Sequence, residues 1–427
     1  MKKVIKPELA SGFRDYLPEE MIPRQRMMDT IRAVFERFGF GPLDTPSIER
    51  EEILTAGDAE FNKQIFRIAS NKKDKKDEVS DLALRFDLTV PLARVVAANS
   101  SLGRPFKRYQ IGKVFRAESS QTGRYKEFMQ CDADIVGSSS LLADAEIIAL
   151  VYAVLTSLNI ENFVIKIGNI GTLSSILTEV GIENEKQKNI TRVIDKLDKI
   201  GWKGVGAEMG SLGIDSRTID RIRETLSDPT KNNNESYRKL IGEKIENLGV
   251  PENRYKIDFS IARGLDYYDG MVFETILTDL PEIGSICSGG RYDYLVSRFS
   301  KEVVPSVGAS VGLDRLFTAL EKLGKIKKQK VAADVLVLNF DESCGGAVQK
   351  TAASLRSAGI KTELYLGKES TFKGQLAYAV SREYPVVVII GPKELERGVV
   401  QVKGMAARTQ TDVRPDLVVG EVKKIIG

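Results

Sequence analysis

Residues 108–134 read RYQIGKVFRAESSQTGRYKEFMQCDAD, and in them two strand-like runs flank a polar loop. Successive side chains of a strand point to opposite faces, so every second residue shares a face. Arg116 and Glu118 then share one face of the first strand. One face of the second strand carries Phe128, Gln130, Asp132 and Asp134. The two runs and their loop predict an antiparallel meander within residues 84–137.

Helical and strand-like segments surround this meander. Before it, Pro23–Phe38 has the apolar spacing of a helix, and a strand is expected at Leu43–Ile48. After it come a buried helix at Leu141–Leu158, a polar helical segment at Thr172–Leu248, an interrupted strand from Ile257 to Glu274, a strand at Ile286–Tyr292 and a helix from Val307 to Leu323. We therefore expect an antiparallel sheet with an inserted helical subdomain.

A basic linker, Gly324–Lys330, precedes a change of pattern. Beyond it, apolar β-runs at Val335–Leu338, Thr362–Tyr365, Val386–Ile390 and Val399–Val402 are separated by helical stretches at Ala347–Ala358 and Gln375–Glu383. Strands that alternate with helices are typical of an α/β domain. We expect this segment of about a hundred residues to be a separate domain.

The composition excludes several classes of protein and of site. The 427 residues, 42% of them hydrophobic, carry 63 Lys and Arg against 59 Asp and Glu, so any site for a polyanion must be local. Three cysteines are too few and too scattered for a disulfide framework or a zinc site, and no apolar run approaches the length of a membrane span. We therefore expect a cytoplasmic protein of two or three domains.

The sequence contains no histidine. The commonest general base and the commonest protein ligand of metals are therefore absent, and Ser–His and Cys–His mechanisms are excluded. Because histidine is the side chain that ordinarily titrates near pH 7, we expect few groups of this chain to titrate there.

An arginine interrupts a strand-like pattern in the hexapeptide Arg263-Gly264-Leu265-Asp266-Tyr267-Tyr268. Its apolar neighbours, such as Phe259 and Ile261, would desolvate the guanidinium, which then persists only beside an anion. Two interpretations remain open at this point. The anion is either a structural carboxylate, from Asp258 or Asp266, or part of a functional site.

The meander carries side chains that suit a nucleotide. Arg116 can pair with a phosphate, Phe128 can stack on a base, and Glu118 can accept a hydrogen bond from an exocyclic amine. The alternative is cross-strand salt bridging on an exposed face. A second group, Val307–Arg315, leads small residues into a helix whose Arg315 can reach a polyphosphate.

Two further segments combine polar residues with glycine or proline. Ser285–Asp293 is a glycine-lined bend beside Tyr292. In Leu84–Pro91, the side chains of Arg85, Asp87 and Thr89 would share one face of a strand. The alternative for this segment is an edge strand that Pro91 stops.

Together these segments resemble the class II histidyl-tRNA synthetases over essentially the whole chain. Phe115-Arg116 with Gly123-Arg124-Tyr125 is similar to motif 2 of that family, Gly312–Arg315 to motif 3, and Asp44-Thr45-Pro46 to the end of motif 1 at the dimer interface. Residues 263–268 and 288–293 resemble the two peptides peculiar to the histidine enzymes.

The resemblance implies an α+β fold, with an antiparallel-sheet class II synthetase catalytic core, a helical insertion and a C-terminal α/β anticodon-binding domain. The implied bounds are 1–170 and 251–325 for the two parts of the core, 171–250 for the insertion and 331–427 for the anticodon-binding domain. It implies a histidine–tRNA ligase, a homodimer that uses ATP with Mg²⁺ to activate L-histidine and to charge tRNA(His). No protein-bound structural metal and no membrane are implied.

The resemblance also implies four sets of site residues. Arg263 and Arg116 would be catalytic, and Gln121 and Arg124 would face the acceptor end of the tRNA. The set implied for ATP is Arg116, Glu118, Arg124, Phe128 and Arg315. The set implied for histidine is Asp87, Thr89, Gln130, Asp134, Arg263, Leu265, Tyr267, Tyr268 and Tyr292.

Several positions depart from the common pattern of the family. Asp87 and Asp134 stand where many members have glutamate, Ala117 stands where many bacterial members have histidine, and Asp314 replaces a glutamate before Arg315. The alternative function is that of a catalytically inactive paralogue, a regulatory subunit that senses histidine or tRNA. Such paralogues typically lack the anticodon domain and erode motif 2, whereas both are intact in this sequence.

Overall fold

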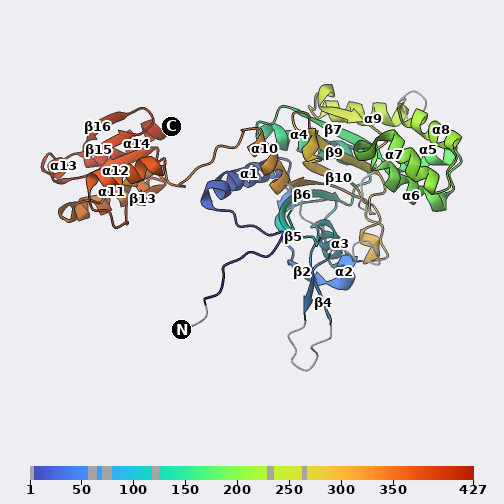
Figure 1. The fold of residues 1–427 in the computed structure, drawn as a ribbon, viewed down its shortest axis with the longest axis horizontal. Helices are drawn as coiled ribbons and strands as arrows, with labels where there is room; N and C mark the ends of the chain where they lie inside the picture. Colours follow the sequence, from blue (N-terminus) through green and yellow to red (C-terminus); the bar gives the residue numbers. More distant parts are fainter. Residues whose placement is uncertain (1–3, 56–64, 70–78, 118–124, 228–234, 262–266) are drawn as a thin grey trace. The chain divides into compact units, whose positions relative to one another are not determined.

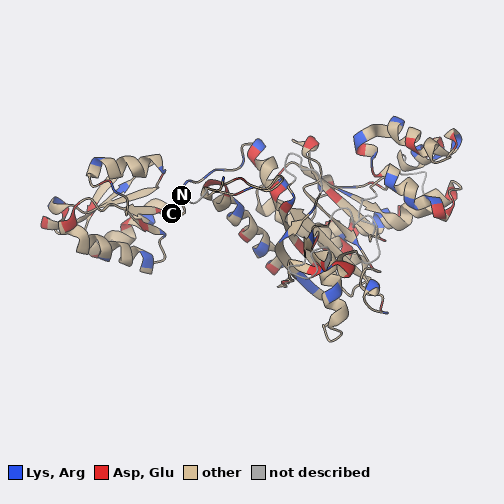
Figure 2. Cartoon of the chain, turned by 60° about the horizontal axis from the view of Figure 1, so that its bottom comes forward, with Lys and Arg blue, Asp and Glu red and all other residues tan. Residues whose placement is uncertain are grey.

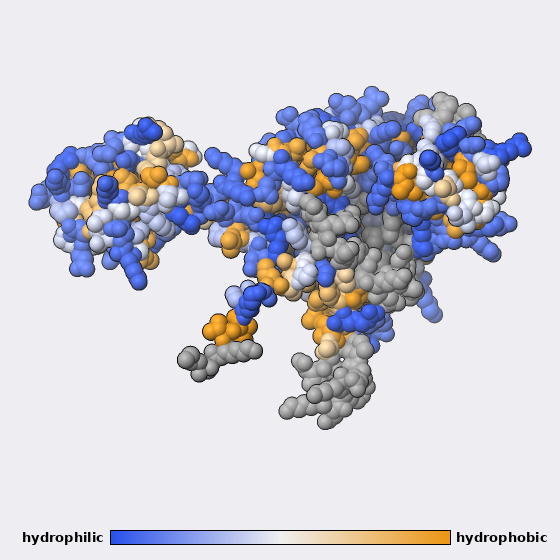
Figure 3. Space-filling model, in the orientation of Figure 1, coloured by the Kyte–Doolittle hydropathy of each residue, from blue (hydrophilic) through white to orange (hydrophobic). Residues whose placement is uncertain are grey.

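The computed structural model describes residues 4–55, 65–69, 79–117, 125–227, 235–261 and 267–427 (Figure 1). The chain forms two compact units, one of residues 1–14 with 26–326 and one of residues 15–25 with 327–427. Lys and Arg are intermixed with Asp and Glu over both units (Figure 2). Hydrophilic residues cover most of the visible face of each unit (Figure 3).

The first unit is built on an eight-stranded sheet with the order β1-β5-β6-β11-β10-β9-β7-β8. Its strands are β1 (Gly41–Pro42), β5 (Phe106–Phe115), β6 (Glu127–Val136), β7 (Phe163–Asn169), β8 (Tyr255–Ile257), β9 (Met271–Leu277), β10 (Cys287–Arg291) and β11 (Ser306–Gly312). Neighbours pair antiparallel except for the parallel pairs β1–β5 and β7–β8. The predicted antiparallel α+β core is confirmed.

Strands β5 and β6 are the pair predicted from residues 108–134. They pair over their full lengths, from Phe106 opposite Val136 to Phe115 opposite Glu127. Gly112 lies inside β5, so the run before the polar loop is one continuous strand. This pair lies within the sheet and carries side chains of the candidate site.

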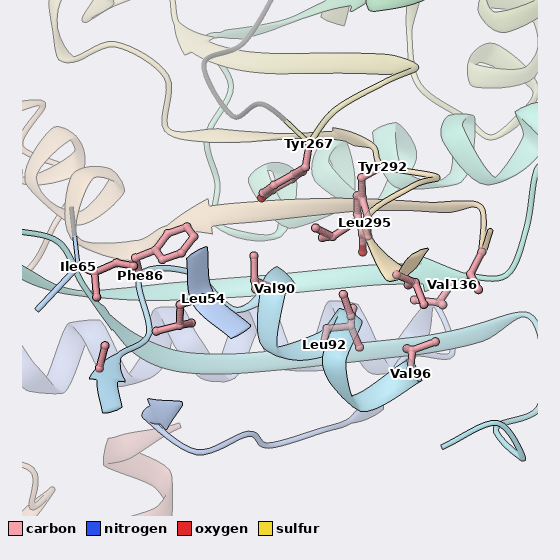
Figure 4. Packing of buried hydrophobic residues seen from close by; sticks show 14 residues of the cluster. Leu54, Ile65, Phe86, Val90, Leu92, Val96, Val136, Tyr267, Tyr292 and Leu295 are labelled. Carbon is pink, nitrogen blue, oxygen red and sulfur yellow. The ribbon is translucent and has the colours of Figure 1, made fainter. Parts of the chain in front are cut away.

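Helices α1 (Pro18–Arg37), α2 (Glu51–Thr55), α3 (Thr89–Ala98), α4 (Leu141–Ser157) and α10 (Leu313–Lys322) belong to the N-terminal three quarters of the chain. The predicted buried helix is α4, which begins where the Ser140 hydroxyl accepts a hydrogen bond from the Leu142 N–H. It contacts β10 and β11 as well as α9 (Glu235–Asn247), which explains why it is apolar nearly all round. Helix α3 packs into a hydrophobic cluster with Tyr267 and Tyr292 (Figure 4).

Two segments have bounds in the structure that differ from those predicted from the sequence. The helix expected from Val307 to Leu323 begins only at Leu313, because Val307, Ala309 and Val311 alternate with small residues and form β11. The interrupted strand expected from Ile257 to Glu274 is two strands, β8 and β9, that lie on either side of β7.

Two further strand predictions are wrong. Residues 43–47 lie outside the strands, and β2 (Ile48–Arg50) begins where the predicted strand ends. The segment from Leu84 to Pro91 is not a single strand, because β4 (Val79–Leu84) ends there and α3 begins at Thr89. Pro91 lies in the first turn of α3, where a helix has no use for its N–H. Arg85, Asp87 and Thr89 therefore do not share a strand face.

A small sheet of β2, β4 and β3 (Arg67–Ala69) also belongs to the first unit. Its inner face is buried at Glu49 and Ala83. Its outer face carries Ile48 and Leu82, whose exposed fractions are 46% and 36%. The same face also carries the exposed Arg50.

The predicted helical insertion is confirmed as α-helical. It consists of α5 (Ile170–Glu179), α6 (Asn184–Ile194), α7 (Leu197–Ser211), α8 (Ser216–Ser227) and α9, which lie together in Figure 1. Helices α5 to α8 share a core of their own that includes Leu173, Ile190, Met209 and Ile222. The segment is rich in polar residues because most of its surface faces solvent around a small core.

The second unit is an α/β domain with a sheet ordered β13-β12-β14-β15-β16. Its strands are β12 (Val335–Val337), β13 (Thr362–Leu364), β14 (Val386–Ile389), β15 (Val400–Gly404) and β16 (Thr409–Val413), and its helices are α11 (Gly345–Ser357), α12 (Phe372–Ser381), α13 (Pro392–Glu396) and α14 (Val418–Ile426). Alternate residues of β12 and β14 enter two separate hydrophobic clusters. Strand β16 was not predicted, because this edge strand is polar and mostly exposed.

Candidate active site

Three neighbouring rows of the large sheet bring polar side chains to one face. In the first row, Arg108 of β5 lies opposite Asp134 of β6, Asp134 opposite Gly308 of β11, and Gly308 opposite Gly290 of β10. The second row is Gln110, Asp132, Ser310 and Ser288, and the third is Gly112, Gln130 and Gly312. Because the rows are two residues apart along each strand, their side chains share a face.

Asp134 is buried on this face; one of its carboxylate oxygens accepts a hydrogen bond, and the other forms an ion pair without hydrogen-bond geometry. The Tyr292 hydroxyl donates to Oδ1 over 2.5 Å, and Oδ2 lies 2.8 Å from Nη2 of Arg108. A Cβ at Gly308 would lie 1.9 Å from Oδ1 of Asp134. Glycine at this position therefore lets the carboxylate lie across the neighbouring strand.

A second buried carboxylate, that of Asp87, lies just before α3. Its Oδ1 accepts a hydrogen bond from the Val90 N–H over 3.1 Å, and its Oδ2 accepts a long one, 3.4 Å, from Tyr267. A negative side chain beside the first turn of a helix is favourable, since the N–H groups there have no partner within the helix. The start of α3, and not a strand, therefore positions Asp87, and buried Thr89 is the first residue of that helix.

Three tyrosines accompany these carboxylates. The ring centroids of Tyr267 and Tyr268 are 4.8 Å apart, and Tyr292 meets Tyr267 edge-on at 5.9 Å. The Tyr268 ring lies against Gly290, where a Cβ would be 2.8 Å from its Cδ1. Figure 4 shows Tyr267 and Tyr292 packed with apolar residues that include Phe86 and Val90. Packing therefore restricts the orientation of these rings.

Gln130 and Ser310 join β6 to β11 through their side chains. The Gln130 amide donates to the Ser310 hydroxyl over 2.5 Å and lies 3.4 Å from Oδ1 of Asp132. Within the described part of the chain, the Gln130 amide oxygen has no hydrogen-bond partner although it is buried. Such an atom suits a site that a polar ligand completes.

Burial changes the titration of the carboxyl groups on this face. It raises the pKa of Asp87 to about 6, against opposing effects of the Val90 N–H and Arg116. It raises the pKa of Asp132 to about 7, where attraction by Arg108 opposes it and repulsion by Asp134 adds to it. The pKa of Asp134 is also raised by burial, against Arg108 and Tyr292. The expectation that few groups titrate near neutral pH is therefore wrong for this cluster.

Two arginines and a phenylalanine lie at the end of the sheet where β5 stops and α10 starts. The Arg116 Nε donates to the Phe86 carbonyl over 3.1 Å, and its Cζ lies 5.2 Å from the centroid of the Phe128 ring. In the first turn of α10, the Arg315 Nη1 donates to the Ser285 carbonyl over 2.5 Å. Asp314 accepts a hydrogen bond from the Met129 N–H over 2.7 Å, which ties α10 to β6.

Two family models match the chain. The model described as histidyl-tRNA synthetase matches residues 12–316, and the model of an anticodon binding domain matches residues 334–425. The chain belongs to the histidyl-tRNA synthetase family.

Relatives in the family match over nearly the full length. A histidine–tRNA ligase of Wolinella succinogenes is 44% identical over 425 residues, which cover 94% of each chain. The crystal structure of histidyl-tRNA synthetase from Nostoc sp. PCC 7120 is 34% identical, with a TM-score of 0.87 over 99% of this chain and 100% of that one. A structure from Bacillus halodurans C, titled as an ATP phosphoribosyltransferase regulatory subunit/histidyl-tRNA synthetase, has a TM-score of 0.73 over 88% of this chain and 97% of that one; at 23% identity it shows a shared fold.

Five of the residues predicted for the histidyl-tRNA synthetase site lie outside the described residues: Glu118, Gln121, Arg124, Arg263 and Leu265. Of the two carboxylates considered as partners of Arg263, Asp266 also lies outside them. Asp258 accepts hydrogen bonds from the N–H and hydroxyl of Ser260, over 3.1 and 2.6 Å. The other predicted residues form the two groups given above, one around the buried carboxylates and one at the end of the sheet.

The sequence pattern did not indicate Arg108 and Ser310 as residues of this face. Arg108 is fully buried and pairs with Asp134, yet it follows Lys107 in the sequence and nothing local distinguishes the two. The pairing register of β5 and β6 would have identified Arg108 as the partner of Asp134. The sequence alone does not give this register, because it does not fix the turn between the two strands.

Two features are absent from the described residues. No group of three or more Cys, Asp or Glu side chains there is arranged to hold a metal ion. No described helix is both long and apolar enough to cross a membrane.

Proposed function

We propose that this chain is a histidine–tRNA ligase. It activates L-histidine with ATP to histidyl-adenylate and transfers the histidyl group to tRNA(His). The observation that supports this most is the buried face on which Asp87, Asp134 and Tyr292 converge, in a chain that matches the family model over residues 12–316. The match of residues 334–425 to an anticodon binding domain supports the tRNA substrate.

The buried face binds L-histidine. Asp87, Thr89 and Gln130 accept hydrogen bonds from the α-ammonium group, for which a buried carboxylate and the partnerless amide oxygen of Gln130 are suitable. Asp134, Tyr268 and Tyr292 receive the imidazole, because a carboxylate and two phenols can recognise both ring nitrogens. Arg263, Leu265 and Tyr267 complete the set.

ATP binds at the end of the sheet beside α10. Arg116 holds the α-phosphate, Arg315 and Arg124 hold the outer phosphates, and Phe128 and Glu118 contact the adenine. Guanidinium groups suit this task because their fork of donors matches phosphate oxygens. Mg²⁺ accompanies ATP and neutralises charge on the phosphates.

The first step requires no histidine residue of the chain. The substrate carboxylate attacks the α-phosphorus and pyrophosphate leaves, so no proton has to be removed from the nucleophile. Arg263 and Arg116 stabilise the charge that develops at the α-phosphate. In the second step, the terminal hydroxyl of tRNA attacks the histidyl carbonyl and AMP leaves. The adenylate phosphate takes the proton, and Gln121 and Arg124 contact the acceptor end.

We also propose an oligomeric state and a role for each domain. The catalytic core comprises residues 1–170 and 251–325, residues 171–250 are an insertion, and residues 331–427 bind the anticodon. The enzyme works in the cytoplasm as a homodimer. The exposed apolar residues Ile48 and Leu82 support a subunit interface at the small sheet, next to Asp44-Thr45-Pro46, which resembles the end of motif 1.

ATP–pyrophosphate exchange with each of the twenty amino acids tests this function. We expect exchange with histidine alone, followed by charging of a tRNA(His) transcript. Exchange with a different amino acid would contradict the assignment. No exchange with any amino acid, together with measurable histidine binding, would indicate the inactive regulatory paralogue.

A further inference from the structure

Arg108 is a buried cation in the middle of the candidate histidine site. Its exposed fraction is 0%, and it lies on the face of β5 that carries the polar rows. A buried guanidinium costs free energy unless its donors are paired. The positions of those donors therefore indicate what the residue does.

A single nitrogen of Arg108 touches two parts of the site. Its Nη2 donates to the Leu88 carbonyl over 3.0 Å and lies 2.8 Å from Oδ2 of Asp134. Leu88 lies between Asp87 and Thr89, which are proposed to bind the α-ammonium group. Asp134 is proposed to receive the imidazole. Arg108 thus joins the two halves of the site through one group.

Fold stability alone does not account for this arrangement. The Nε and Nη1 atoms of Arg108 are buried without a hydrogen-bond partner in the described part of the chain. Unpaired buried donors lower the stability of the folded state, and a packed apolar side chain would often serve the fold as well. The presence of Arg108 is therefore better explained by the groups that it orients.

We propose that Arg108 is a positioning residue, which holds the Asp134 carboxylate and the segment Asp87–Thr89 in one fixed arrangement and thereby sets the affinity for histidine. The inference rests on the proposed function. Asp134 is held at one oxygen by Tyr292 and at the other by Arg108. A hydrogen bond at one oxygen and a cation 2.8 Å from the other restrain the carboxylate from both sides.

Exchange kinetics of Arg108→Met and Arg108→Lys test the proposal, with purified full-length protein. In Arg108→Met, the KM for histidine should rise at least about tenfold, because a buried carboxylate and a carbonyl lose their donor. The KM for ATP should stay within about twofold, since the ATP residues lie at the end of the sheet. Arg108→Lys keeps a cation opposite Asp134 and should give an intermediate KM for histidine.

Lys107→Met provides a matched control on the same strand. Lys107 points to the opposite face of β5 and pairs with Glu146 over 2.5 Å, so its loss also removes a partly buried ion pair. We expect this variant to keep the wild-type KM for histidine. A rise equal to that of Arg108→Met would show that any damage to β5 has the same effect, and it would overturn the proposal.

Two outcomes separate this inference from the proposed function. If the wild-type protein does not exchange with histidine, the function fails. If the wild type exchanges and folded Arg108→Met keeps its KM for histidine within about twofold, the positioning role fails. If Arg108→Met does not fold, Arg108→Gln takes its place, because its amide still donates to a neighbouring oxygen. A KM for histidine at least about tenfold above that of the wild type then supports the positioning role, and one within about twofold refutes it.

Discussion

Asp132 is a buried carboxyl group whose protonation depends on its surroundings. It is buried between Asp134 on its own strand and the Gln130 and Ser310 side chains. Burial raises its pKa from 3.8 to about 7. A carboxyl whose pKa is higher in the folded state binds its proton more tightly there. Its contribution to stability is therefore fully present below pH 4 and is lost as the pH rises through 7.

Replacing this carboxyl by an amide should remove that pH dependence. Relative to the wild type, Asp132→Asn should gain free energy of unfolding as the pH rises from 5 to 8, by up to about 3 kcal/mol, since the rest of the effect falls below pH 5. Urea-induced unfolding of both proteins at the two pH values measures the difference. A difference that is the same at pH 5 and pH 8 would show that Asp132 does not titrate in this range.

A short polar contact ties the start of helix α10 to β6, beside the proposed ATP site. Asp314 is buried in its first turn and accepts a hydrogen bond from the Met129 N–H, next to Phe128. Arg315 follows directly in the helix. The shorter aspartate, where many family members have glutamate, therefore still reaches β6.

Loss of this contact should affect ATP more than histidine. In Asp314→Ala, the Met129 N–H loses its acceptor, which costs about 1–3 kcal/mol and loosens the start of α10. We expect the KM for ATP in pyrophosphate exchange to rise several-fold with little change in the KM for histidine. Asp314→Asn retains an acceptor oxygen and is the control. Equal effects on both substrates would count against a local role for the contact.

The elements also show what the sequence can and cannot predict. Alternation of side chains predicted β5 and β6 and the shared face of Gln130, Asp132 and Asp134, because period two is a local property. The same rule failed before α3, since Asp87 turns to the start of a helix that local pattern did not indicate. Arg108 was missed because its partner is set by register across two strands.

For the molecule as a whole, the exposed face of the small sheet is the surface at which we expect the second subunit of the proposed homodimer to bind. Ile48 and Leu82 lie on that face beside Arg50 and Leu84, while Glu49 and Ala83 face inward. An apolar surface of this kind is stabilised when a second subunit covers it. The proposed homodimer provides such a cover.

A charge at this face should therefore weaken the dimer. A chain of 47.2 kDa should sediment at twice that mass, and Ile48→Lys should shift the population toward the single-chain mass because a lysine would be buried without a partner. Analytical ultracentrifugation at several concentrations measures this shift. Leu366→Lys, at a residue 83% exposed in the other unit, should leave the mass unchanged. A wild-type protein that sediments at the single-chain mass would refute the homodimer.

Gly308, which lies opposite Asp134, and Gly290, which lies opposite Gly308, have a consequence for efforts to change the amino acid that this enzyme family accepts. At Gly308 an added Cβ would meet the Asp134 carboxylate, and at Gly290 it would meet the Met271 backbone carbonyl as well as the Tyr268 ring. Neither glycine has a side chain with which to contact a substrate, yet both leave the space in which side chains of the site lie. A mutant library for new specificity should therefore keep positions 308 and 290 constant.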